Sequence, residues 1–247
     1  MAHLVAPVMG TTVSIDVRDP GVGREALDAA LDRLCEIEAR FSTYRPDSEI
    51  SRIDRGDLDL ADAHPEVREV LAACDVLRAQ TGGAFDARYG GRIDPSGYVK
   101  GWAGSEAAGV LRARGATRFM LNLGGDIVCA GEPEPGLPWR VGVRDPADPG
   151  RMMLVLGVRD GAVATSGRYE RGDHLLDPRI GGPATRWDSI TVMAPDLATA
   201  DAFATAAFVM GESGPGWVAA QTGCGVAAAA GGRLLTSDLV DRATIRV

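Results

Sequence analysis

Strand-like and helix-like patterns follow one another irregularly along this chain of 247 residues. Residues 11–17 alternate between apolar and polar side chains, as a strand does. Residues 24–41 instead repeat large apolar side chains at spacings of three and four, as an amphipathic helix does. Residues 118–123 and 127–130 are typical of two strands joined at Gly124-Gly125-Asp126. Because strands and helices do not alternate regularly, the sequence predicts an α+β fold rather than a doubly wound α/β fold.

The remaining patterns extend this mixture over the whole chain. We expect further helices at 65–81, 99–114, 201–210 and 216–222, and further strands at 139–144, 152–159, 162–166, 189–193, 225–229 and near Arg246. The sequence contains no internal repeat and no low-complexity linker, and the DPADPG stretch at 145–150 has the composition of a surface loop. We therefore expect residues 1–247 to form a single domain.

Composition excludes several classes of protein. The net charge of −8 leaves no surplus of basic residues to neutralise phosphates, which argues against nucleic-acid binding. Four cysteines lie far apart, without the spacing of a zinc site or a disulfide scaffold, so we expect free thiols in a reducing compartment. The N-terminus lacks the pattern of a signal peptide, and no stretch reaches the roughly 18 apolar residues of a membrane span. A cytoplasmic location without a membrane span is expected.

Lys100 is the only lysine among 26 basic residues. In a chain that otherwise uses arginine, a single lysine indicates a position that needs a compact ammonium with three rotatable donors. It follows an Asp-Pro-Ser-Gly turn at 94–97, near the expected start of a helix, where backbone amides and the helix dipole favour anions. The alternative is a surface lysine without a function.

Asp201 and Thr205 are spaced four residues apart on an expected helix and would share one face. A carboxylate and a hydroxyl are oxygen ligands, which suit a hard cation such as Mg²⁺. The alternative is an acidic residue in the first turn of a helix with an unrelated threonine on the same face.

His174 lies between short stretches that are rich in glycine and polar residues, as in an active-site loop. Its ordinary pKa suits a general base near neutrality. The alternative is a loop histidine that caps a neighbouring carbonyl. We expect His3 and His64 to be exposed.

Four other segments stand out, and two of them are weak indications when taken singly. The glycines of 82–86 (GGAFD) and of 124–126 (GGD) are typical of a helix C-cap and a hairpin turn, or of backbone that approaches a ligand closely. Met9-Gly10-Thr11 and the polar segment 42–51 are harder to dismiss. In the polar segment 42–51, Tyr44 could stack on a planar ring, and the alternative is a helix-to-strand connector.

Together these segments resemble, nearly from end to end and in the same order, the FAD:protein FMN transferase family of ApbE-like flavin transferases. The matching motifs are MGTT (9–12), FSTYRPDSEISRI (41–53), TGGAFD (81–86), IDPSGYVKGWA (93–103), LNLGGDI (121–127), WRVGV (139–143), ATSGRYER (164–171), HLLDPRIGG (174–182), SITVMAP (189–195) and ADAFATAAFVMG (200–211). The resemblance implies an ApbE-like, T-fold-like domain with a mixed, largely antiparallel sheet and packed helices. It also implies Mg²⁺-dependent transfer of the FMN half of FAD to a threonine hydroxyl of an acceptor protein, with release of AMP.

The resemblance assigns roles residue by residue. The implied FAD contacts are Met9, Tyr44, Ala84, Phe85, Asp86, Asp94, Lys100 and the main chain of Leu175. The implied Mg²⁺ ligands are the carbonyl of Gly97 and the side chains of Asp201 and Thr205. His174 is the implied catalytic base.

The chain departs from the family pattern in one large respect. Members commonly carry a long segment between GAFD and the following ID motif, whereas Asp86 and Asp94 are nearly adjacent here. We expect a differently shaped rim on the adenine or acceptor side. HLLDP in place of HI-x-DP is a milder, apolar change.

Two other functions use the same residues. One is a Mg²⁺-dependent FAD pyrophosphatase, with water as the nucleophile, and the other is a non-catalytic FAD-binding protein. The acceptor motif of flavinylated proteins resembles (Asp/Ser)-Gly-(Ala/Ser)-Thr. This chain has Val163 where that motif requires threonine, so we expect no self-flavinylation at 160–163.

Overall fold

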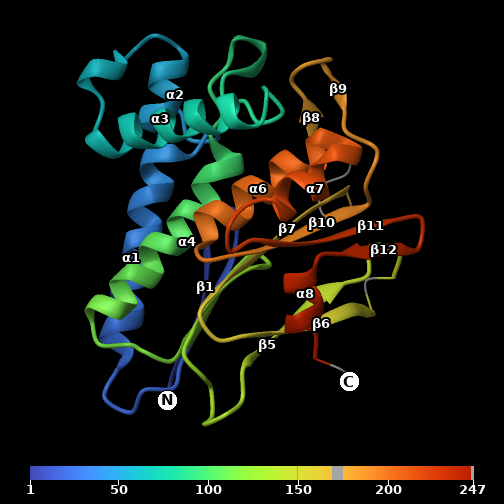
Figure 1. Cartoon of the computed structure of the whole chain (residues 1–247). Coiled ribbons are helices and arrows are strands. Elements are labelled where there is room, and N and C mark those ends of the chain that lie inside the picture. The colour runs from blue at the N-terminus through green and yellow to red at the C-terminus, as the bar shows by residue number, and fades with distance from the viewer. Residues whose placement is uncertain (149, 169–174, 246–247) are drawn as a thin grey trace.

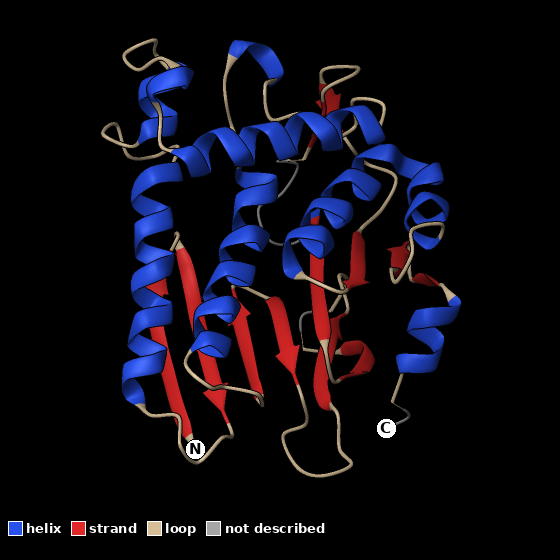
Figure 2. Ribbon diagram, turned by 60° about the vertical axis from the view of Figure 1, so that its left-hand side comes forward, coloured by secondary structure: helices blue, strands red, loops and turns tan. Residues whose placement is uncertain are grey.

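A computed structural model describes residues 1–148, 150–168 and 175–245 and shows a sheet layered against helices (Figures 1 and 2). In this part of the chain the main sheet has the strand order β1-β2-β3-β4-β7-β10-β11-β12, and each neighbouring pair is antiparallel. The strands are β1 (Ala2–Val8), β2 (Thr11–Val17), β3 (Phe119–Leu123), β4 (Asp126–Ala130), β7 (Gly161–Gly167), β10 (Ser189–Ala194), β11 (Gly225–Ala230) and β12 (Arg233–Thr236). The expected α+β fold with a largely antiparallel sheet is confirmed.

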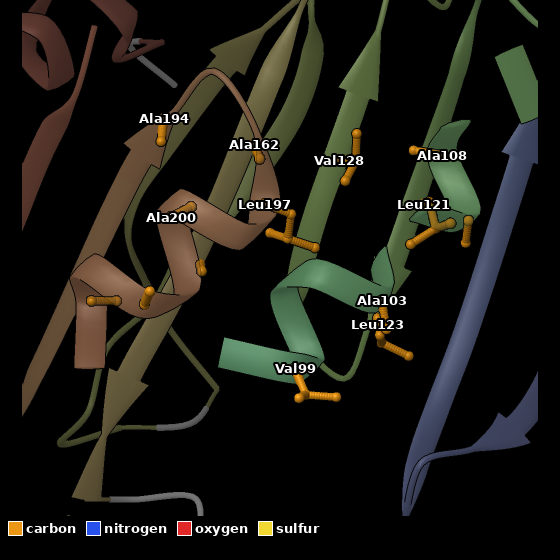
Figure 3. Close-up of a cluster of buried hydrophobic side chains, with 14 of the residues drawn as sticks. Val99, Ala103, Ala108, Leu121, Leu123, Val128, Ala162, Ala194, Leu197 and Ala200 are labelled. Atoms are coloured by element: carbon orange, nitrogen blue, oxygen red, sulfur yellow. The ribbon is translucent and has the colours of Figure 1, made fainter. Parts of the chain in front are cut away.

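Helices cover one face of this sheet. They are α1 (Arg24–Phe41), α4 (Ser96–Ala113), α6 (Leu197–Met210) and the short α7 (Gly214–Ala219), which follows the 3₁₀ turn η3 (Gly211–Ser213). The main hydrophobic core lies between these helices and the sheet. Figure 3 shows Val99 and Ala103 of α4 and Leu197 of α6 among strand side chains such as Leu121 and Val128. Burial of this apolar surface is the main stabilising contribution in such a layer.

A second, smaller core lies on the opposite face of the sheet. It is covered by the ribbon of β5 (Trp139–Arg144) and β6 (Met152–Val158) and by α8 (Asp238–Ala243). Alternate residues of a strand point to opposite faces. In β7, Ala162 and Ala164 therefore belong to the helix-covered core, whereas Val163 belongs to the ribbon-covered core.

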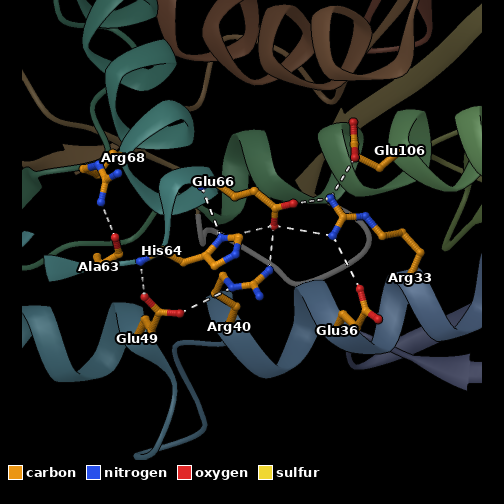
Figure 4. A network of polar contacts seen from close by, with 9 residues as sticks. All are labelled: Arg33, Glu36, Arg40, Glu49, Ala63, His64, Glu66, Arg68 and Glu106. Atoms are coloured by element: carbon orange, nitrogen blue, oxygen red, sulfur yellow. Dashed lines mark hydrogen bonds and ion pairs between the residues drawn. The ribbon is translucent and has the colours of Figure 1, made fainter.

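Two short helices and a longer one form a cap at one end of α1 and α4. They are α2 (Glu49–Asp54), η1 (Leu60–Asp62) and α3 (Pro65–Gln80). A polar network joins the cap to the body (Figure 4). In it, Glu66 of α3 accepts hydrogen bonds from Arg33 at 2.7 Å and Arg40 at 2.6 Å, and Arg33 also reaches Glu106 of α4 at 2.7 Å.

Two smaller elements complete the described structure. The turn η2 (Tyr89–Gly91) lies between α3 and α4, and β8 (Leu176–Asp177) pairs with β9 (Gly182–Pro183) in a small hairpin. Figure 1 places this hairpin at the same end of the molecule as the cap.

Several boundaries differ from the sequence-based expectation. Helix α4 begins at Ser96 rather than at 99, and α6 begins at Leu197 because the side chain of Asp196 caps it by accepting from the Thr199 N–H at 2.9 Å. Asp201 is therefore not a first-turn residue. Segment 42–51 leads into a helix rather than a strand, because Ser48 caps α2. Near the C-terminus the structure forms α8, which was not expected, followed by an isolated β-bridge between Thr244 and Leu156. The strand expected near Arg246 extends beyond the described residues.

Candidate functional site

Helices α4 and α6 approach each other through glycines of α4. A Cβ atom at Gly101 would overlap the carbonyl oxygen of Leu197 and lie 2.6 Å from Cβ of Asp201. At Gly104 it would lie 2.5 Å from Cδ2 of Leu197. Only glycine permits so close a crossing, and the crossing brings the first turns of α4 against the first turns of α6.

The three residues that are expected to bind the metal all belong to these two crossing helices. The Gly101 N–H donates to Oδ2 of Asp201 at 2.8 Å, and Asp201 is buried. In a regular helix that N–H donates to the Gly97 carbonyl, so Asp201 competes with this carbonyl for the same proton. A Cβ atom at Gly97 would lie 3.5 Å from Cγ2 of Thr205. The structure thus places Gly97, Asp201 and Thr205 at the same helix crossing.

Lys100 forms an ion pair that the sequence analysis did not predict. Its Nζ lies 2.6 Å from Oδ2 of Asp126, whose side chain is 2% exposed at the start of β4. The other carboxylate oxygen, Oδ1, accepts from the Thr165 N–H at 3.2 Å. Burial raises the pKa of the Asp126 carboxyl, and the charge of Lys100 acts in the opposite direction. Asp126 therefore holds the single lysine in place. The motif at 124–126 indicates a hairpin turn or backbone close to a ligand, but not this ion pair.

Two hydroxyls of β7 extend this polar region to opposite faces of the sheet. Oγ of Ser166 lies 3.1 Å from Oγ1 of Thr205, on the helix-covered face. Oγ1 of Thr165 lies 2.9 Å from Oγ1 of Thr191 on the neighbouring strand β10. β7 therefore touches both the Lys100–Asp126 pair and the expected metal ligands.

The turn that carries Met9 lies beside this region. Met9 and Gly10 form the two-residue turn between β1 and β2, and Met9 has a φ of 53°, which is unusual for a bulky residue. A Cβ atom at Gly124 would lie 2.5 Å from Oγ1 of Thr11, so this turn packs against the one that leads into Asp126. A strained residue next to a polar cluster is a common feature of binding sites.

Residues 84–94 form a short, closed loop at the start of α4. Ala84 and Phe85 are buried, and a Cβ atom at Gly97 would lie 3.3 Å from the Phe85 ring. Asp86 pairs with Arg78 at 2.9 Å, and the Asp94 N–H donates to the Ala87 carbonyl at 2.8 Å. The Phe85 ring therefore lies next to the α4–α6 crossing, and Asp94 lies two residues before the start of α4.

The β8–β9 hairpin packs against the same loop. A Cβ atom at Gly181 would lie 3.1 Å from the Tyr89 hydroxyl, and one at Gly83 would lie 3.7 Å from Cγ of Arg179. Leu175, directly before the hairpin, is partly buried against the main core. His174, the expected base, lies outside the described residues.

Tyr44, which is expected to contact FAD, lies exposed on the surface. Its side chain is 90% exposed, in the loop between α1 and α2. This loop begins near α4, because Phe41 at the end of α1 packs on Trp102 of α4 with ring centroids 5.4 Å apart. Stacking of Tyr44 on a ring remains a prediction.

Comparison with known proteins decides the family. The model of the ApbE family matches residues 9–92 and 87–228. The chain belongs to the ApbE family. The two matched pieces overlap at residues 87–92, between the GAFD and ID motifs.

Individual members of the ApbE family are similar to this chain in sequence and in structure. A protein named FAD:protein FMN transferase from Vibrio cholerae is 29% identical over 272 residues, which cover 85% of this chain and 81% of that protein. The alignment is longer than the whole of this chain, so the Vibrio protein contains additional residues. The solved structure of the ApbE protein of Thermotoga maritima has a TM-score of 0.89 at 25% identity and covers 99% of both chains. That of the flavin transferase ApbE from Vibrio cholerae has a TM-score of 0.83 at 25% identity and covers 97% of this chain and 98% of the other.

Proposed function

We propose that this chain is a Mg²⁺-dependent FAD:protein FMN transferase, which moves FMN from FAD to a threonine hydroxyl of an acceptor protein and releases AMP. The observation that carries the proposal is the α4–α6 crossing, where Gly97, Asp201 and Thr205 lie beside one another. Membership of the ApbE family and the name of the Vibrio cholerae relative support the same reaction.

The donor set fits Mg²⁺. The Gly97 carbonyl, the Asp201 carboxylate and the Thr205 hydroxyl all offer oxygen, and Mg²⁺ usually takes few protein ligands and keeps positions for water and phosphate. Within the described residues no group of three or more His, Cys, Asp or Glu side chains could hold a metal ion, so a softer metal has no comparable site there. When bound, Mg²⁺ would neutralise charge on the pyrophosphate of FAD.

Lys100 and the first turn of α4 would bind the phosphates. Lysine carries a compact ammonium with rotatable donors, and the side chain of Lys100 stays partly exposed beside Asp126, which lies 2.6 Å away. Met9, Tyr44, Ala84, Phe85, Asp86, Asp94 and the main chain of Leu175 would hold the rest of FAD. This assignment rests on the family motifs, and the approach of Phe85 to Gly97 at the crossing supports it.

The transfer itself needs an acceptor hydroxyl and a base. The threonine Oγ would attack the phosphorus on the FMN side of FAD, the bond to the AMP phosphate would break, and His174 would take the hydroxyl proton. His174→Ala should therefore bind FAD as the wild type does and transfer FMN about 10²- to 10⁴-fold more slowly. Loss of FAD binding in this variant would make His174 a structural residue instead.

The metal dependence can be tested separately. Asp201→Ala should abolish Mg²⁺-stimulated turnover, because only one side-chain ligand then remains. Equal activity of this variant and the wild type across a Mg²⁺ titration would contradict the assigned ligand.

The direct test of the reaction uses an acceptor domain that contains Asp-Gly-Ala-Thr, incubated with this protein, FAD and Mg²⁺. Mass spectrometry of the acceptor and quantification of AMP and free FMN from the same sample distinguish the functions. An FMN adduct on the threonine with an equal amount of AMP supports the transferase. AMP and free FMN without an adduct would indicate an FAD pyrophosphatase, and intact FAD would indicate a binding protein.

The location of the reaction is also a proposal. We expect it in the cytoplasm, because all four cysteines are unpaired, as is usual in a reducing compartment. No helix in the described ranges has the length and apolarity needed to cross a bilayer.

A further inference from the structure

Ser166 is a buried hydroxyl residue directly behind one of the proposed metal ligands. Its Oγ lies 3.1 Å from Oγ1 of Thr205, and the residue is 8% exposed. Ser166 follows Ala162 and Ala164 on the helix-covered face of β7, whose small side chains let α6 pack closely on the strand. The strand therefore presents one polar atom to α6, at the level of Thr205.

A hydroxyl that binds a cation has two requirements. One lone pair must point toward the cation, and the hydroxyl proton must point away from it and toward an acceptor. A neighbouring oxygen at hydrogen-bond distance satisfies the second requirement and thereby fixes the first. Groups in this position commonly tune metal affinity as strongly as some direct ligands do.

We propose that Ser166 is a positioning residue for the metal site. Its Oγ accepts the hydroxyl proton of Thr205 and so turns a Thr205 lone pair toward the cation held with Asp201 and the Gly97 carbonyl. The inference rests on the proposed Mg²⁺ site and adds to it a residue that does not itself touch the metal.

Thr165 is a matched control in the same strand. It is the neighbouring residue and also carries a partly buried hydroxyl, but its Oγ1 bonds Thr191 of β10 rather than a residue of α6. Its contribution to the anchoring of Asp126 comes from the backbone N–H, which a side-chain substitution retains. Removal of either hydroxyl deletes one hydrogen bond of similar length.

The test measures Mn²⁺ binding to the whole chain by electron paramagnetic resonance, with the metal alone as the probe and no turnover required. Ser166→Ala should weaken Mn²⁺ binding by about 10- to 100-fold, as loss of such a supporting group commonly does. Thr165→Ala should bind Mn²⁺ as the wild type does. In a Thr205→Ala background, Ser166→Ala should cause no further loss, because Ser166 acts through Thr205.

Thermal unfolding of the same variants distinguishes positioning from a purely structural role. Both single substitutions should lower Tm by a few degrees, roughly the effect of one lost hydrogen bond. If Ser166→Ala lowers Tm but binds Mn²⁺ as tightly as the wild type, the inference is overturned while the proposed metal site stands. If the wild type shows no saturable Mn²⁺ binding, the metal site fails and the inference fails with it.

Discussion

The ammonium of Lys100 lies against a carboxylate that is almost fully removed from water. A buried charge without a partner is strongly destabilising, whereas replacing both members of a buried pair costs much less. The pair therefore has a consequence for stability as well as for the proposed phosphate binding.

Lys100→Met should destabilise the fold by about 3 kcal/mol, because it leaves the Asp126 carboxylate buried with only the Thr165 N–H. Adding Asp126→Asn to that variant should restore part of the loss. Urea unfolding of the two variants and the wild type measures both effects. A double variant that is no more stable than Lys100→Met would show that the unpaired Asp126 carboxylate is not the cause of the loss.

The cysteine thiols should differ in reactivity. Burial raises the pKa of Cys74 and of Cys129 to about 12, whereas Cys35 is exposed. Because the thiolate is the reactive form, a maleimide at pH 7.5 should label Cys35 in the folded protein and label Cys74 and Cys129 only after unfolding. Peptide mass spectrometry after labelling provides the check. Equal labelling of Cys35 and Cys129 in the native protein would contradict the described core.

Residue patterns predicted part of this site. Lys100 is conspicuous as a single lysine, and Asp201 and Thr205 share a helix face. Asp126 and Ser166 could not be identified in the same way, because their partners lie 26 and 39 residues away along the chain. Such pairs exist only after strands β4 and β7 have been placed under α4 and α6.

The crossing of α4 and α6 depends on the absence of side chains along one face of α4. Gly101→Ala should destabilise the protein by about 1–3 kcal/mol, because the new methyl group overlaps the Leu197 carbonyl and the helices must separate. It should also weaken Mn²⁺ binding, since Asp201 moves with α6.

Gly109→Ala is the matched control in the same helix. A Cβ atom there meets nothing within 4 Å, so this substitution should stabilise the protein by about 0.4–1 kcal/mol. Denaturant unfolding of the two variants compares them directly. Similar effects of both substitutions would contradict the close crossing.

The polar network between the cap and the body should lose part of its stabilising effect at acidic pH. Burial raises the pKa of Glu66, but the hydrogen bonds and charge of Arg33 and the charge of Arg40 outweigh it and hold that pKa below its ordinary value. The carboxylate therefore stabilises the fold above the pKa of about 4.3 of an unfolded glutamate, and this contribution is lost as pH falls through the lower folded pKa.

Glu66→Gln should accordingly be less stable than the wild type at pH 7, and the difference should shrink as the pH falls below about 4. Urea unfolding of both proteins across this range gives the comparison. A stability difference that is independent of pH would show that the charge of Glu66 does not contribute.

Periodicity predicted the elements that have one buried face, such as α1, α3 and β2. It missed β1, an edge strand in which only Leu4 and Val8 are buried, and it placed the start of α6 too late. α6 is apolar around most of its circumference because it lies between α4 and the sheet, so its sequence has little amphipathic pattern. Its start is determined by the Asp196 cap instead.

The order of motifs along the whole chain predicted the family and the α+β fold more securely than any single residue could. Packing determined what the motifs alone did not, namely that the short loop 84–94 and the β8–β9 hairpin touch at Tyr89 and Gly181. We expect that this contact forms part of the rim beside the proposed site.

A crystal structure of the protein with FAD and Mn²⁺ tests the proposed site most directly. An anomalous difference map recorded for manganese should show one peak in contact with the Gly97 carbonyl, Asp201 and Thr205, with the FAD pyrophosphate between that peak and Lys100. A manganese peak elsewhere, or FAD bound away from the α4–α6 crossing, would contradict the proposed metal and FAD site and therefore the proposed function.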